Sequence, residues 1–83
     1  MYNYQTEPPH IFTEEGQVMF LKIRDNTKRL LGISGVARMQ EMISVCSGST
    51  WHMIACVDRM VELREIREVS PPGCMAQHRL FSI

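Results

Sequence analysis

Apolar residues recur every three or four positions over the first third of the chain, which predicts an amphipathic helix. The helix begins after Thr13, whose hydroxyl can cap it and which is followed by Glu14 and Glu15, and it ends at Gly32. Its apolar arc is Met19, Phe20, Ile23, Thr27, Leu30 and Leu31. The arc is expected to face the core.

Two more helices are predicted after Gly32. Ile33 is expected to form a single-residue strand, Ser34 to cap a short second helix, and the run from Ser47 to Thr50 to break the pattern and cap a third helix over residues 50–63. The buried stripe of the second helix is Val36, Met39, Ile43 and Cys46. That of the third is Met53, Cys56, Val57, Met60 and Leu63, extended by Ile54 and Val61. The outward side of the third helix holds Trp51, His52, Ala55, Asp58, Arg59 and Glu62.

Alternation of the strand type follows the third helix. Residues 65–69 and 78–81 read as two strands around a turn at 70–73, in which Pro72 and Gly73 suit the central positions of a type II turn. Ile66 and either Leu80 or Phe81 are expected to share the core face. Arg67 and Arg79 are expected to point outward.

This order of elements predicts an α+β fold, a small winged helix with three helices followed by a two-stranded hairpin, the wing. The domain spans residues 13–83. Residues 1–12 carry Pro8 and Pro9 but little periodicity, so they are predicted to be a flexible or loosely docked lead-in. Its Ile11 and Phe12 are expected to pack beneath the first helix.

Composition limits the alternatives. Eighty-three residues make one small domain, and no apolar run approaches the roughly 20 residues that span a bilayer. The N-terminus lacks the features of a signal peptide, and the three cysteines are odd in number, as expected of reduced thiols. We therefore expect a cytoplasmic protein. Nine basic and nine acidic residues cancel, which weakens the case for nucleic acid, although a local patch can suffice.

The segment from Trp51 to Val69 resembles the junction between the third helix and the second strand of winged helix-turn-helix proteins, with Arg64 at the turn position where glycine is frequent. Parts of the hairpin are also similar to the wing of fimbrial phase-variation regulators of the FaeA type: Val69-Ser-Pro, Gly73-Cys-Met-Ala and Leu80-Phe81. The resemblance implies DNA binding in transcription control. It places the third helix in a major groove and the wing on phosphate or the minor groove, with no cofactor.

The candidate DNA contacts come from both elements: Thr50, His52 and Arg59 on the third helix, and Arg67, His78 and Arg79 on the wing. Asp58 and Glu62 share the helix face and would repel phosphate. The three candidate contacts on the third helix are therefore equally consistent with a solvated surface. Arg67 and Arg79 can instead pair with Glu65 and Glu68 of the hairpin, in exposed ion pairs that contribute little to stability.

The alternative function is a protein-interaction or dimerisation module on the same fold. Trp51, with Ala55 one turn further on, is the candidate interface, because an exposed tryptophan is costly and this residue type anchors interfaces. The chain itself can also cover Trp51 in either of two ways. The N-terminal segment can fold over the indole through Tyr2, Tyr4 or Phe12, or the indole can pack against the second helix.

Neither a metal site nor catalysis is predicted. His52 and Cys56 are four residues apart on a helix, and Cys74 and His78 repeat that spacing, but four residues on a strand span about 13 Å. No short pair of cysteines of the zinc-binding type occurs. The chain also lacks a glycine-rich phosphate loop, and it is too small for a deep cleft.

Overall fold

The computed structural model describes residues 2–83, and its longest element is helix α2, Glu14–Ser34. The predicted start of this helix is confirmed, since the Thr13 side chain accepts a hydrogen bond from the Gly16 amide. The predicted end is wrong. Gly32 lies inside the helix, and Gly35, with a φ of 77°, terminates it in the left-handed conformation that glycine adopts freely.

The helix extends beyond its predicted end, so the elements that follow are displaced. Strand β1 is Val36–Arg38, whereas Ile33, predicted to be a strand residue, is an exposed residue of α2. Ser34, predicted to cap the second helix, is the last residue of α2 instead. The short helix α3, Met39–Met42, follows β1 directly and continues into the 3-10 turn η2, Ile43–Val45. Val36 is exposed, which is contrary to the predicted buried stripe, whereas Met39 is fully buried as expected.

Helix α4, Thr50–Glu62, agrees with the predicted third helix to within one residue at its end. The Ser49 hydroxyl caps it by accepting a hydrogen bond from the His52 amide. Its buried stripe packs against α2 and forms the centre of the core with Ile23 and Phe81. Two predictions fail on this helix: Leu63 is half exposed, and Ala55, predicted to face outward, is fully buried.

The three strands form one antiparallel sheet of order β1-β3-β2, in which β2 is Arg67–Glu68 and β3 is Leu80–Ser82. The central residue is Phe81, which pairs with Ala37 of β1 and with Glu68 of β2. The predicted hairpin is present, and its loop turns at Pro72 and Gly73, where Gly73 has a φ of 77°. Its second strand starts later than predicted because Ala76–His78 form the 3-10 turn η3.

The described chain is thus a small α+β structure with four helices and a three-stranded sheet, where three helices, a single-residue strand at Ile33 and a two-stranded hairpin were predicted. The additional helix belongs to the N-terminal segment, residues 2–12, whose 3-10 turn η1 is Tyr4–Thr6 and whose helix α1 is Pro8–Ile11. Met1, the first residue of the predicted lead-in, lies outside the described residues.

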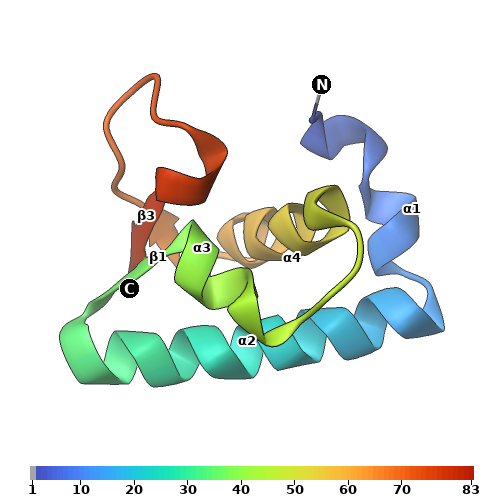
Figure 1. The fold of residues 1–83 in the computed structure, drawn as a ribbon, viewed down its shortest axis with the longest axis horizontal. Helices are drawn as coiled ribbons and strands as arrows, with labels where there is room; N and C mark the ends of the chain where they lie inside the picture. The colour runs from blue at the N-terminus through green and yellow to red at the C-terminus, as the bar shows by residue number, and fades with distance from the viewer. Residues whose placement is uncertain (1) are drawn as a thin grey trace.

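The N-terminal segment lies beside the N-terminal half of α2 and along α4 (Figure 1). Ile11 is buried in the protein, whereas Phe12 is exposed. The contact with α2 is close at Gly16, where a Cβ atom would stand 2.0 Å from the carbonyl oxygen of His10. Only glycine permits this approach.

Candidate functional site

The N-terminal segment covers the outward side of α4. Four side chains of the helix each contact an aromatic or imidazole side chain of the segment: His52, Asp58, Arg59 and Glu62. We call this set the covered face. The residues lie along one side of the helix, as their predicted outward position requires. Ala55 lies among them, and its complete burial agrees with the cover.

Two tyrosines bind the acidic residues of the covered face. The Tyr2 hydroxyl donates to Asp58, and the Tyr4 hydroxyl donates to Glu62 over 3.0 Å. Burial and the bond to Glu62 raise the pKa of Tyr4 to about 12, and burial and the bond to Asp58 raise the pKa of Tyr2 further. Both phenols are therefore hydrogen-bond donors at neutral pH.

Two further pairs involve rings. The imidazoles of His10 and His52 stack with centroids 4.2 Å apart and an angle of 25° between their planes. The Arg59 guanidinium lies 5.3 Å from the centroid of Phe12 and also forms an ion pair with Glu62 on its own helix. The hydrogen bond that Arg59 donates to Glu62 in this ion pair, together with the one from Tyr4, lowers the pKa of Glu62.

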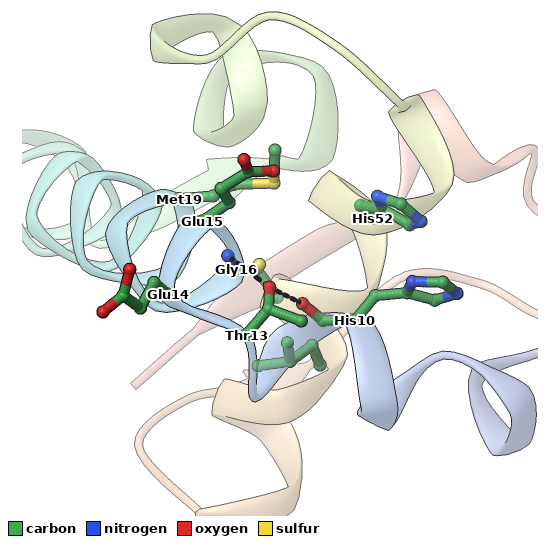
Figure 2. A pocket seen from close by; sticks show the side chains of 9 residues that line it. His10, Thr13, Glu14, Glu15, Gly16, Met19 and His52 are labelled. Atoms are coloured by element: carbon green, nitrogen blue, oxygen red, sulfur yellow. Dashed lines mark hydrogen bonds between the residues drawn. The ribbon is translucent and has the colours of Figure 1, made fainter.

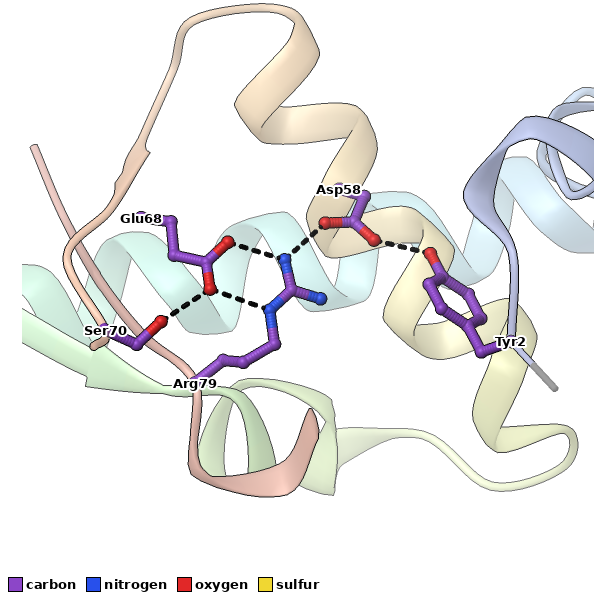
Figure 3. A network of polar contacts seen from close by, with 5 residues as sticks. All are labelled: Tyr2, Asp58, Glu68, Ser70 and Arg79. Atoms are coloured by element: carbon purple, nitrogen blue, oxygen red, sulfur yellow. Dashed lines mark hydrogen bonds and ion pairs between the residues drawn. The ribbon is translucent and has the colours of Figure 1, made fainter. Parts of the chain in front are cut away.

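Arg79 joins the sheet to the covered face. Its guanidinium donates to Asp58 over 2.7 Å and binds Glu68 through two nitrogens at 2.9 and 3.0 Å (Figure 3). Burial alone would lower the pKa of Arg79, but the bonds to Glu68 and Asp58 outweigh it and raise the pKa. The hydrogen bond from Arg79 lowers the pKa of Glu68 in turn. The arginine is thus a largely buried crosslink.

The six predicted DNA contacts divide into two groups. His52, Arg59 and Arg79 are held by partners within the protein, and the prediction that Arg79 points outward is wrong because its side chain is only 17% exposed. The pairing of Arg79 with Glu68 matches the alternative that the sequence indicated. The other three contacts, Thr50, Arg67 and His78, are exposed.

The exposed group is sparsely charged. The Nε atom of Arg67 donates to the main-chain oxygen of Ile83 over 3.1 Å, so this arginine is exposed but has a bonding partner. Its predicted alternative partner, Glu65, instead forms an ion pair with Arg24 over 2.8 Å. Arg67 is therefore the one arginine among the six candidates that has no acidic side chain as a partner in the described chain.

Trp51 lies at the edge of the cover. It is 46% exposed, and the Tyr2 ring meets it edge-on with centroids 6.4 Å apart. The N-terminal segment therefore covers part of the indole through Tyr2, which is one of the two arrangements that the sequence allowed for a covered Trp51. Ala55, predicted to share an interface with Trp51, is buried beneath the segment and offers no surface.

A pocket of about 510 Å³ opens between the starts of α2 and α4, and His10 and His52 lie on its wall (Figure 2). Glu7 stands close to both imidazoles: one ligand atom from each of Glu7, His10 and His52 lies within 4.8 Å of the others. Cys56, which the sequence pairs with His52, is a poor ligand, since burial raises the pKa of its thiol to about 12, with a smaller effect from Cys46.

Sequence reasoning missed both Glu7 and His10. The spacing of Glu7 and His10, three residues apart at the start of a helix, was visible in the sequence. Their approach to His52 was not, because it depends on how the N-terminal segment docks.

No helix among residues 2–83 is both long and apolar enough to cross a membrane. Comparisons with protein-family models, curated proteins and solved structures find no match to this chain. The predicted cytoplasmic location and the predicted absence of catalysis therefore stay predictions.

Proposed function

We propose that the chain is a winged-helix protein that acts as a protein-interaction module. The order of its elements supports the winged helix: a long helix, a strand, two helices and a hairpin, with the first strand pairing beside the last. With α1 left aside, this order is consistent with the winged helix, and we take it as support for the proposal. The hairpin between β2 and β3 then corresponds to the wing.

One observation carries the choice of function: the N-terminal segment occupies the side of α4 that would have to enter a DNA groove. A groove-reading helix needs its outward side chains free to contact base edges. Here Asp58 and Glu62 are bound by tyrosines, and Arg59 and His52 are engaged by rings. The chain is also neutral overall, so it lacks the charge that attracts phosphate.

The interaction surface that we propose is centred on Trp51. Its half-exposed indole and the adjoining Tyr2 ring offer an aromatic anchor of the kind that dominates binding energy at protein interfaces. We propose a second copy of this chain as the partner, because two neutral molecules do not repel each other and a twofold contact would bury both tryptophans together.

The test uses Trp51 as its own reporter, since the sequence contains one tryptophan. Sedimentation velocity should show the mass rise from 9.6 kDa toward twice that value with concentration, while the Trp51 emission shifts to shorter wavelength. Trp51→Ala should abolish the rise in mass. The matched control is Leu21→Ala, which truncates a similarly exposed apolar side chain on α2 and should leave association unchanged. A monomer with constant emission up to about 1 mM, the range of weak complexes, would rule out the homodimer.

DNA binding is the second candidate, and the exposure of Thr50, Arg67 and His78 favours it. It predicts amide shifts at these residues when a duplex is added at about 50 mM salt, largely lost near 200 mM. Arg67→Glu should abolish the shifts, and Lys22→Glu, the same charge reversal on α2, should weaken them much less. Absence of any salt-sensitive shift would exclude this candidate, whereas its presence at Thr50 and the hairpin would replace the interaction proposal.

A further inference from the structure

We propose that Glu7, His10 and His52 form a binding site for a divalent transition metal of the zinc class, which would fasten the N-terminal segment to α4. The site draws two ligands from α1 and its N-cap and the third from the first turn of α4. The proposal does not depend on whether the protein binds DNA or another protein.

The first argument is the state of the Glu7 carboxylate. Its side chain is 9% exposed, and its Oε2 atom is buried without a hydrogen-bond partner in the described structure. The nearest cationic candidate is the Nε2 atom of His52, 3.8 Å away, which is beyond hydrogen-bond distance. An unpaired carboxylate in such a position is costly, and a metal ion is one of the few partners that satisfy it. The Glu7 carboxylate therefore lies beside the imidazoles with no hydrogen-bond partner for its Oε2 atom.

The second argument is geometry. Ligand atoms bound to a tetrahedral zinc at about 2.0–2.2 Å lie roughly 3.3 Å from one another. The three ligand atoms here lie within 4.8 Å, so each pair must close by at most about 1.5 Å. Both imidazoles stand at the wall of the pocket, as Figure 2 shows for His10 and His52, where rotation of the rings meets open space.

The third argument is the chemistry of the ligands. Two imidazoles and one carboxylate suit zinc, cobalt and nickel, whereas calcium and magnesium prefer ligand sets made of oxygen. Three protein ligands leave one coordination position for water, and the pocket of about 510 Å³ adjoins it. Cys56 also lines the pocket, but its raised pKa disfavours the thiolate that a metal requires.

Cobalt(II) is the probe of choice because its visible absorption reports ligand type and geometry. Titration of the metal-free chain should saturate at one equivalent and show the moderately intense visible d–d bands of a four-coordinate cobalt site. Each of His10→Ala, His52→Ala and Glu7→Gln should weaken binding by more than about tenfold, since even loss of an outer-shell partner costs 10–100-fold. The matched control is His78→Ala, which removes an exposed histidine outside the cluster and should bind as the parent does.

A second measurement needs no variant. The sequence has three histidines, so zinc should shift the imidazole NMR signals of His10 and His52 and leave those of His78 in place. The proposal is overturned by no saturable binding up to about 1 mM metal, the limit of weak affinity. It is equally overturned by binding that survives the loss of His10 and His52, or by the intense near-ultraviolet band of a cobalt–thiolate bond.

Discussion

Replacing Arg79 by alanine should destabilise the protein far more than replacing Arg67, although both arginines belong to the hairpin and both were predicted to contact DNA. The difference lies in their partners. Arg79 links the end of the hairpin to α4 through Asp58 and to β2 through Glu68, whereas Arg67 makes a single hydrogen bond, to a main-chain oxygen at the surface. The comparison tests whether Arg79 is structural.

The magnitude follows from burial. The Arg79 and Asp58 side chains are 17% and 15% exposed, so removing the guanidinium leaves a largely buried carboxylate whose remaining partner is Tyr2. A hydrogen bond to a charged group contributes about 1.5–3 kcal/mol. The Glu68 pair is more exposed and adds at most about 1 kcal/mol. We therefore expect Arg79→Ala to lower the free energy of unfolding by about 2–3 kcal/mol, below the roughly 3–5 kcal/mol of a fully buried pair.

Urea denaturation followed by Trp51 fluorescence measures this loss. For a chain of this size the denaturant slope is about 1 kcal/mol per molar, so the midpoint should fall by roughly 2–3 M. Arg67→Ala serves as the matched control, because truncation of an exposed side chain should change stability by less than about 0.5 kcal/mol. Arg79→Lys keeps the charge but loses the two-nitrogen contact with Glu68, so its loss should be intermediate.

Equal losses for Arg79→Ala and Arg67→Ala would refute the argument. A double-mutant cycle between Arg79 and Asp58 tests the crosslink directly, since the effects of two hydrogen-bonded residues on the free energy of unfolding should be coupled by more than about 0.5 kcal/mol. Independent effects of the two substitutions would mean that the crosslink contributes nothing to folding. Arg79 would then again be available as a DNA contact.

Three further outcomes are expected in the same assay. Arg64→Gly should raise the free energy of unfolding by about 0.5–1 kcal/mol, because Arg64 has a φ of 61° in the left-handed region, and Arg64→Ala should give no such gain. Gly16→Ala should lower the free energy of unfolding by more than about 2 kcal/mol and shift the amide signals of residues 8–12, because the new Cβ would clash with the backbone of His10. Gly32→Ala, its control in open space inside α2, should raise the free energy of unfolding by up to about 1 kcal/mol. Folding lowers the pKa of Glu68, so the stabilising contribution of this residue is complete at pH values above its ordinary pKa of 4.5 and is lost as the pH falls through the folded-state pKa. Arg79→Ala should remove this pH dependence. A series of denaturation curves from about pH 7 to about pH 3 would reveal the difference.

The elements with local signals were predictable. Thr13 caps α2 and the serine–glycine break precedes α4, because capping depends on neighbours in the sequence. The end of α2 was not predictable in the same way, since Gly32 and Gly35 carry the same local signal. Only the structure shows which of them takes positive φ. A strand was predicted at Ile33, but the true position of β1 could not be read from the sequence because its partner, β3, lies more than forty residues away.

The covered face had no periodic signal to follow. Tyr2 and Asp58 are 56 residues apart, and pairs at such a distance leave no pattern along the chain. Ala55 did carry a hint, because a small residue among polar ones permits a close approach by another segment. A helical wheel registers only that Ala55 lies opposite the core stripe, and it cannot show that a second layer of the protein covers that side.

The hold of the N-terminal segment on α4 decides which surface the protein presents. Helix α1 has four residues, too few to be stable alone, so the segment depends on Ile11, which fills a buried site, and on a few hydrogen bonds and ring contacts with α4. A short segment held by so few contacts can open locally without unfolding the core. When it is closed, Trp51 and Tyr2 form the aromatic surface; when it is open, the acidic residues Asp58 and Glu62 face solvent. Because those carboxylates repel phosphate, opening alone does not turn α4 into a DNA-reading helix, and the closed state is the one that favours a protein partner.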